Sequence, residues 1–337
     1  MKILKWLGLF LLLAVIGGLW YAQPLLRVGA GYAAKMACSC HYIHGRELAD
    51  IQATDLDYSA LPYATLALDE DAKTVTASFL GMARKIAHFI PGRGCVLRAE
   101  ENAPLPDPYP NATGRNISEF PTYDTLPAGI NMAQVEASVN AAFTPMPQGG
   151  TRAVVVLHDG HVVYEQYAEG FDQDTRLLGW SMSKSVTNAL IGLAVKAGKL
   201  RLEQTQLFEH WTDERSTIAL ADLLHMNSGL AWNEAYGGTS DATVMLYEQA
   251  DMAAYAAKQP LEFAPNTVYE YSSGTTNLLT DLLSDNYDER AYYALWRDSL
   301  FNELGVYDPY FECDQAGNLV GSSYAWLRAR DWAKLGQ

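Results

Sequence analysis

Apolar residues recur at helical spacing in the segment 179–195, where the strongest chemical signal of the chain also lies. One face of this segment carries four apolar residues, Val186, Leu190, Leu193 and Ala194. This spacing predicts a helix with one buried side. Ser181 is expected in the first turn of that helix, and Lys184 follows three residues later on the same side.

The remaining pattern divides into strands and helices. Two β-rich runs, 152–157 and 161–167, flank an Asp-Gly pair at 159–160 and predict a hairpin. Another strand is predicted at 73–79. Helical patterns cover residues 131–143, 219–226, 241–258, 278–283 and 292–304. Two strands followed by the serine-bearing helix and a run of further helices indicate an α+β fold.

The N-terminal pattern is typical of an export signal. Lys2 and Lys5 precede an uncharged apolar run over residues 6–22. Trp20 occupies a position where signal cleavage needs a small residue, so we expect residues 1–26 to be an uncleaved signal anchor rather than a cleaved signal peptide. The body of the protein would then lie in the periplasm or outside the cell, anchored in a bacterial inner membrane. If the segment is cleaved, the protein is secreted.

Prolines recur between residues 102 and 127 and predict an extended connector. Proline lacks a backbone N–H and has a fixed φ, so a helix is disfavoured there. The chain is therefore divided into an N-terminal extension with its connector, residues 27–128, and a main domain, residues 129–337.

Composition limits the classes of partner. The chain has 337 residues, of which 49% are hydrophobic, enough for a full core. Its formal net charge of −15 argues against nucleic acid as a partner, because a phosphate backbone would be repelled.

Three pairings are open to the four cysteines, Cys38, Cys40, Cys95 and Cys313. We expect structural disulfides or inert thiols. A metal site that includes His41 and His44 is the alternative hypothesis. It is disfavoured because the sequence has no second pair of Cys or His residues at the spacing of metal ligands.

Ser181 and Lys184 form a Ser-x-x-Lys pattern with a chemical rationale. A hydroxyl in the first turn lies near the positive end of the helix, beside backbone N–H groups that have no partner within it. An amine on the same face accepts the hydroxyl proton if burial lowers its pKa. The pattern therefore indicates a serine nucleophile activated by lysine; a serine cap next to a surface lysine is the alternative.

Four segments, in this order, resemble motifs of the penicillin-recognising serine hydrolases, the class C β-lactamase-like superfamily. They are 180–185 (Ser-x-x-Lys), 223–230 (Leu-Leu-His-Met-Asn-Ser-Gly-Leu), 265–267 with 271–274 (Tyr-Ser-Ser-Gly), and 330–336. The second and third are most similar to the 6-aminohexanoate-dimer hydrolase-like branch. The resemblance covers the chain from about residue 130 onward. It implies a β-lactamase/DD-peptidase-like fold, with an antiparallel sheet flanked by helices and an all-helical lobe.

The resemblance also implies roles for individual residues. Tyr271 is the third catalytic residue, which passes the proton to the leaving group. Ser273 replaces a frequent asparagine; its hydroxyl can hydrogen-bond near Lys184 but lacks the separate donor and acceptor of an amide. This replacement disfavours β-lactam recognition more than hydrolysis. Gly274 and His225 are supporting or substrate-binding residues, His225 mainly as a structural residue of its loop. No metal or cofactor is implied.

One motif of the superfamily, a Lys/His-x-Gly strand with the second oxyanion-hole N–H, would lie beyond Gln337. We therefore expect the chain to be a C-terminally truncated piece of a longer protein, without the last strands of the sheet. Loss of one oxyanion donor typically costs about 2.7–4 kcal/mol of transition-state stabilisation. The piece alone is accordingly expected to fold or act poorly.

Three functions compete at this point. The leading hypothesis is a serine hydrolase that cleaves a small-molecule amide or ester through an acyl-enzyme on Ser181. The second is a β-lactamase or DD-peptidase. The third is a non-catalytic, envelope-associated binding protein on the same scaffold. The residues do not identify the substrate or the oligomeric state.

Overall fold

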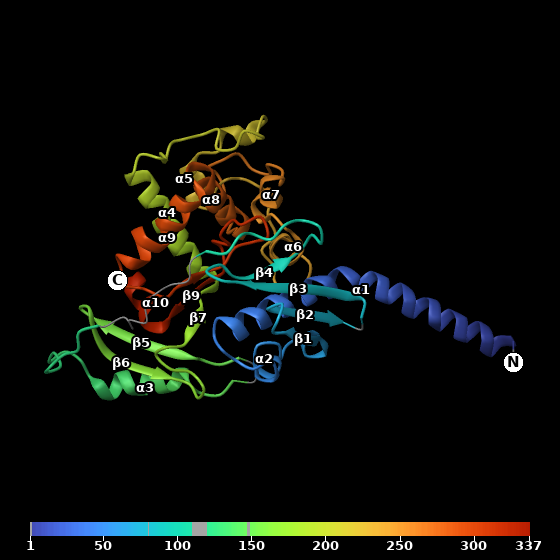
Figure 1. Cartoon of the computed structure of the whole chain (residues 1–337), viewed down its shortest axis with the longest axis horizontal. Helices are drawn as coiled ribbons and strands as arrows, with labels where there is room; N and C mark the ends of the chain where they lie inside the picture. The colour runs from blue at the N-terminus through green and yellow to red at the C-terminus, as the bar shows by residue number, and fades with distance from the viewer. Residues whose placement is uncertain (1, 80, 110–119, 147–148) are drawn as a thin grey trace.

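A computed structural model describes residues 2–79, 81–109, 120–146 and 149–337. Helices and strands are mixed along this length. Figure 1 shows a long N-terminal helix, α1, beside a four-stranded sheet, then a two-stranded hairpin with one helix next to it, and a cluster of helices around a small sheet. The first part of α1 projects from the body, and the C-terminus lies near the hairpin.

The strands are β1 (Thr65–Asp69), β2 (Thr74–Phe79), β3 (Ala83–Ile90), β4 (Gly94–Arg98), β5 (Ala153–His158), β6 (His161–Tyr167), β7 (Arg176–Leu178), β8 (Tyr310–Phe311) and β9 (Ala325–Arg328). The helices are α1 (Lys2–Tyr42), α2 (Leu48–Thr54), α3 (Met132–Ala142), α4 (Ser183–Lys196), α5 (Leu220–Leu224), α6 (Asp241–Glu248), α7 (Met252–Ala257), α8 (Ser273–Asn286), α9 (Glu289–Trp296) and α10 (Ala329–Gly336). Short helical turns are η1 (Leu61–Tyr63), η2 (Trp180–Met182), η3 (Glu214–Thr217) and the π-type turn η4 (Arg297–Asn302).

The extension is an antiparallel sheet, ordered β1-β2-β3-β4, with the second half of α1 packed on it. Fully buried small residues of α1 allow this close approach: Ala30, Ala33, Ala34 and Ala37. Opposite them, the sheet presents Val75 and Ala87, which face each other across β2 and β3. The strand predicted at 73–79 is confirmed as β2. It belongs to a sheet with three further strands that the pattern did not predict, of which β1 and β3 pair with it directly.

Helix α1 continues without interruption through residue 26, where we predicted the end of a signal segment. Across the part of the chain that the structure describes, none of the helices combines the length and apolar character needed to cross a bilayer. In the predicted connector, residues 102–109 and 120–127 contain no helix and no named strand, and its middle lies outside the described residues.

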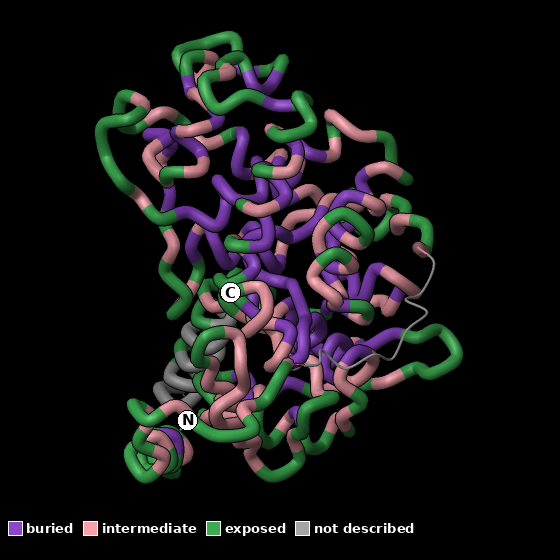
Figure 2. Tube along the Cα trace, turned by 90° about the vertical axis from the view of Figure 1, so that its left-hand side faces the viewer, coloured by how far each residue is buried: buried purple, intermediate pink, exposed green. Residues whose placement is uncertain are grey.

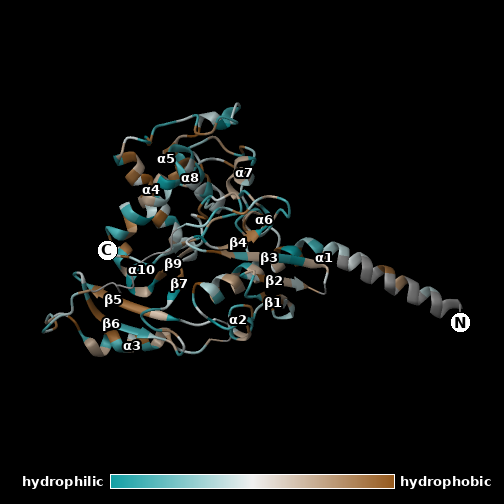
Figure 3. Ribbon diagram, in the orientation of Figure 1, coloured by the Kyte–Doolittle hydropathy of each residue, from teal (hydrophilic) through white to brown (hydrophobic). Residues whose placement is uncertain are grey.

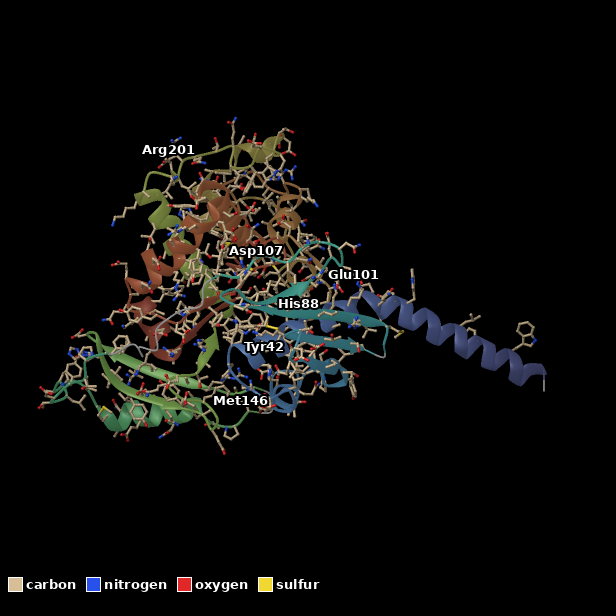
Figure 4. The ribbon with its side chains drawn as sticks, viewed as in Figure 1. Tyr42, His88, Glu101, Asp107, Met146 and Arg201 are labelled. Atoms are coloured by element: carbon tan, nitrogen blue, oxygen red, sulfur yellow. A yellow bond between two sulfur atoms is a disulfide. The ribbon has the colours of Figure 1, made fainter. Side chains whose placement is uncertain are left out.

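Two buried connections join α1 to the rest of the molecule. A disulfide links Cys38 of α1 to Cys95 of β4, so the structure contains one of the possible pairings, while Cys40 and Cys313 are buried free thiols. Figure 4 shows this disulfide as a yellow bond near the labelled Tyr42. Close by, the ammonium of Lys35 lies 2.8 Å from a carboxylate oxygen of Glu312. The disulfide fixes α1 to β4 within the extension, and the ion pair connects α1 to the chain just after β8.

The predicted hairpin is confirmed as β5 and β6. Asp159 and Gly160 have φ angles of 44° and 76°, the two positive values that a two-residue type I′ turn requires. Strand β5 is hydrophobic, as its brown colour in Figure 3 indicates, but its residues are only half-buried. The continuous core instead includes residues of α1, α4 and α8. Figure 2 shows buried segments, in purple, through the middle of the molecule.

The helical region differs from the prediction in three places. The helix predicted over 292–304 is α9, which begins at residue 289 and ends at residue 296, followed by the π-type turn η4. The segment 241–258 is two helices, α6 and α7, because Gln249 is extended and the side chain of Asp251 caps the second helix. Helix α8 begins at Ser273, five residues before the predicted segment, since Ser272 accepts a hydrogen bond from the backbone N–H of Thr275. The early start places Ser273 and Gly274 in the first turn of α8.

Candidate active site

Ser181 lies in the turn η2, directly before α4. This agrees with the prediction that it stands in the first turn of a helix. The preceding Trp180 has a φ of 44°, a left-handed conformation that costs energy for a residue with a side chain. A Cβ on Gly179 would lie 2.2 Å from the ring of Trp332, so only glycine fits where the serine turn meets α10. Two of the segments that carry the family resemblance thus meet in space.

Lys184 is held in contact with the serine. Its Nζ donates to Ser181 Oγ at 3.3 Å, to Ser273 Oγ at 3.1 Å and to the carbonyl oxygen of Ser322 at 3.0 Å. Burial lowers the pKa of Lys184 to about 8, against the opposing charge of Glu234. A substantial fraction of this amine is therefore neutral near physiological pH, as a general base requires.

The other predicted site residues take different positions. Tyr271 presents its ring to the lysine, with Lys184 Nζ 4.8 Å from the ring centroid, and its side chain is 37% exposed. Ser273 is fully buried in the contact with Lys184. Gly274 lies against an indole: a Cβ on it would be 2.5 Å from the ring of Trp232. His225 ends α5 as an exposed residue. Among the described contacts, none joins His225 to Ser181 or Lys184.

Glu234 accepts hydrogen bonds from several residues on the side of the site away from Ser181. Nothing in its sequence context distinguished it from other acidic residues. Its carboxylate accepts from Ser273 Oγ at 2.5 Å and from the Ser273 backbone N–H at 2.9 Å. The indole of Trp232 donates to it at 2.5 Å and the hydroxyl of Tyr236 at 2.6 Å. Tyr236 also lies 3.3 Å from Ser273 Oγ, and burial together with this carboxylate raises its pKa. A continuous chain of contacts therefore leads from Ser181 through Lys184 and Ser273 to Glu234.

The segment before β9 supplies the fourth contact of the lysine, and no motif in the sequence marked this segment. Gly321 lies between α4 and α8, where a Cβ would be 2.4 Å from Thr187 Oγ1 and from the methyl group of Thr280. Beyond it, the backbone N–H of Ser322 donates to the side-chain oxygen of Asn277 at 3.2 Å. These contacts aim the Ser322 carbonyl at Lys184, 138 residues away in the sequence.

Ser181 opens into a cavity of about 420 Å³, near the lower end of the roughly 300–1,000 Å³ usual for small-molecule sites. Its walls come from α1, from residues 58–61, from residues 236–247 and from the serine turn. In the part of the chain that the structure describes, no group of three or more His, Cys, Asp or Glu side chains is placed to hold a metal ion.

Comparisons with known proteins are consistent with this scaffold. The family model described as Beta-lactamase matches residues 139–335, more than half of the chain. Similar solved structures include "Putative 6-aminohexanoate-dimer hydrolase from Bacillus anthracis", at 18% identity and a TM-score of 0.49, covering 60% of this chain and 55% of that one. A class C beta-lactamase from Rhodobacter sphaeroides is 16% identical with a TM-score of 0.43, covering 60% and 63%. The chain therefore spans little more than half the length of the first of these proteins. No curated protein matches the sequence.

Proposed function

We propose, from the premise that the chain belongs to the beta-lactamase family, that it is a serine hydrolase that cleaves an amide or an ester. One observation carries this proposal. Lys184 Nζ lies 3.3 Å from Ser181 Oγ, and burial lowers the pKa of this amine to about 8. Nucleophile and base are therefore within hydrogen-bond reach, and the base is available near neutral pH.

In the proposed reaction, Ser181 Oγ attacks the carbonyl carbon while its proton passes to Lys184 Nζ. The bond to the leaving amine or alcohol breaks when that group takes a proton, which leaves an acyl ester on Ser181. Water then attacks the carbonyl carbon of this ester. The bond from that carbon to Ser181 Oγ breaks, the carboxylic acid is released, and Ser181 Oγ regains its proton. Tyr271 is proposed as the residue that carries the proton to the leaving group. Its ring face, 4.8 Å from Lys184 Nζ, also favours the ammonium form that follows proton transfer.

Ser273 and the carbonyl of Ser322 are proposed to hold Lys184 in place. Both accept from its Nζ, at 3.1 and 3.0 Å. Glu234 in turn accepts from Ser273 Oγ, so the Ser273 hydroxyl cannot donate elsewhere. A β-lactamase or DD-peptidase activity is less well supported, because this hydroxyl has no free donor to offer a substrate carbonyl.

Covalent labelling tests the assignment of the nucleophile. A fluorophosphonate should label the full chain at Ser181 and should not label the Ser181→Ala variant. Ser185→Ala is the matched control, because Ser185 is exposed on α4 and takes no part in the site. Equal labelling of Ser181→Ala and the wild type would contradict the proposal. No labelling of any folded form would favour the non-catalytic alternative.

A location outside the cytoplasm is also proposed. The Cys38–Cys95 disulfide supports it, since such bonds persist in oxidising compartments. Cell fractionation, with the mass of the mature chain, tests the proposal and distinguishes membrane anchoring from secretion. Recovery of the reduced protein in the cytoplasm would contradict it.

A further inference from the structure

The nucleophile's cavity is built in part by α1, which lies outside the segment matched by the family model. Four residues of α1 line it: Leu25, Val28, Gly29 and Tyr32. We propose that this stretch of α1 is a specificity-determining wall, and that the cavity takes an uncharged, apolar group next to the scissile bond of the substrate. The proposal rests on the hydrolase function proposed above and adds the class of substrate.

The chemistry of the walls supports an apolar occupant. Of the described residues that line the cavity, none carries a charge. Leu25, Val28 and Leu61 contribute aliphatic surface, and burial raises the pKa of the Tyr32 phenol, so this hydroxyl stays neutral. A charged group placed here would lose its hydration without gaining a partner of opposite charge, which is costly.

Aromatic contacts connect the α1 wall directly to the serine turn. The ring of Tyr32 stacks on that of Trp180, with centroids 6.4 Å apart and planes 3° from parallel. Its edges meet Tyr58 at 5.8 Å and Tyr247 at 5.6 Å. Trp180 precedes the nucleophile, and its left-handed backbone directs the indole. The ring of Tyr32 is thus fixed beside Ser181 by three aromatic neighbours.

The wall is anchored as part of the fold. Gly31 packs so closely that a Cβ would lie 2.7 Å from that of Tyr247. Arg27 forms an ion pair with Glu248 at 2.5 Å, and Lys85 of β3 contacts the same carboxylate at 3.1 Å. These contacts fix α1 against α6 within the stretch that lines the cavity, and they fix α6 in turn against β3. The extension therefore has a preformed surface for the substrate.

Leu25 is the best position for a test, because its side chain is 48% exposed and a substitution there leaves the core intact. The full chain would be assayed with p-nitrophenyl acetate, butyrate and octanoate, and with the anionic p-nitrophenyl hemisuccinate. A parallel series of alkyl esters would vary the alcohol side. We expect kcat/KM to rise about tenfold or more from acetate to the best apolar ester in at least one series, and to be lowest for the hemisuccinate.

Leu25→Arg should lower kcat/KM for the best apolar ester about tenfold and raise it for the hemisuccinate severalfold, because it places a cation on the wall. Leu25→Ala should reduce the apolar preference without the gain for the anion. Leu202→Arg is the matched control: Leu202 is also an exposed leucine, at 43%, and does not line the cavity.

The outcomes separate the two proposals. Unchanged preference in both Leu25 variants, with acetate turnover and Ser181 labelling retained, would overturn the specificity wall alone. The same shift in Leu202→Arg would also overturn it, because the effect would then come from charge at a distance. If Ser181 of the wild type is not labelled, both the hydrolase function and the specificity-determining wall are overturned.

Discussion

At the residue scale, the chemistry of the site depends on whether Lys184 carries a proton. Lys184 lies among two hydroxyls, a carbonyl and an aromatic ring, and burial reduces its affinity for the proton. Glu234 acts in the opposite direction through its charge, and it is connected to the lysine by Ser273. The balance between burial and this carboxylate places the pKa of Lys184 at about 8.

A pH profile is the first prediction at this scale. The neutral amine is the active form, and its folded pKa lies below the ordinary value of 10.5. The rate of Ser181 labelling should therefore rise with pH, with an inflection at about 8, and level off above it. A rate that falls through this range, or that shows no inflection, would contradict the role of Lys184 as base.

Glu234→Gln should move that inflection to lower pH, because it removes the charge that raises the pKa of Lys184. Measurement of the labelling rate against pH in both proteins checks this. Glu203→Gln, at an exposed position outside the site, is the control and should leave the profile unchanged. An inflection that stays in place in Glu234→Gln would show that the carboxylate acts only through geometry.

At the scale of elements, three glycines position the site, because each allows two elements to pack more closely than a side chain would permit. Helix α8 approaches Trp232 at Gly274, the serine turn approaches α10 at Gly179, and the segment before β9 passes α4 at Gly321. In each place a Cβ would come within 2.5 Å of a neighbouring side chain. These contacts bring Ser181, Ser273 and Ser322 together around one lysine.

Two glycine-to-alanine substitutions test this packing. Gly274→Ala should destabilise the protein by about 1–3 kcal/mol and slow labelling, because the added methyl displaces Trp232 or α8. Gly192 lies within α4 with nothing inside 4 Å of its potential Cβ. Gly192→Ala should therefore stabilise the protein by about 0.5–1 kcal/mol, as alanine favours a helix. Urea denaturation measures both; equal effects would refute the packing argument.

At the scale of the whole molecule, the shape of the site depends on how the extension is connected to the family domain. Helix α1 carries one wall of the nucleophile's cavity. The disulfide fixes it to β4 within the extension, and the Lys35–Glu312 pair joins it to the family domain. Glu312 also accepts from the indole of Trp326 at 2.7 Å and from the backbone N–H of Cys95 at 2.6 Å. The carboxylate therefore joins α1, β4 and β9.

Removal of the disulfide should reduce overall stability. The bond closes a loop with a sequence separation of 57, for which the chain-entropy model gives about 4 kcal/mol. Denaturation of the Cys38→Ala, Cys95→Ala double variant, compared with wild type, measures the loss. Reductant should destabilise the wild type and leave the double variant unchanged. Equal sensitivity of both proteins to reductant would contradict the prediction.

A double-mutant cycle tests the buried ion pair. Lys35→Met or Glu312→Gln alone should cost about 3–5 kcal/mol, since each disrupts a buried charge network. The double variant should cost clearly less than the sum of the two, because the partners lie 2.8 Å apart. Chemical denaturation of all four proteins provides the values. Additive losses would show that the two side chains act separately.

Local patterns in the sequence predicted the elements that depend on near neighbours. Helix α4, the hairpin and the contact between Ser181 and Lys184 all follow from residues a few positions apart. Periodicity could not predict the break between α6 and α7, because it depends on the cap at Asp251. The family resemblance identified Ser273 and Gly274, but the long-range position of Glu234 had no local signal.

The sequence by itself determined the serine–lysine pair, because spacing along one helix turn defines their distance. It also determined the mixed fold and the family, through motifs that occur in order. Only the tertiary structure decided which cysteines pair, which carboxylate faces the lysine and that α1 lines the cavity. Those contacts join residues far apart in the sequence, by 39 positions for Glu234 and Ser273 and by 57 for the two cysteines. Such contacts are decided by packing of the whole chain rather than by local periodicity.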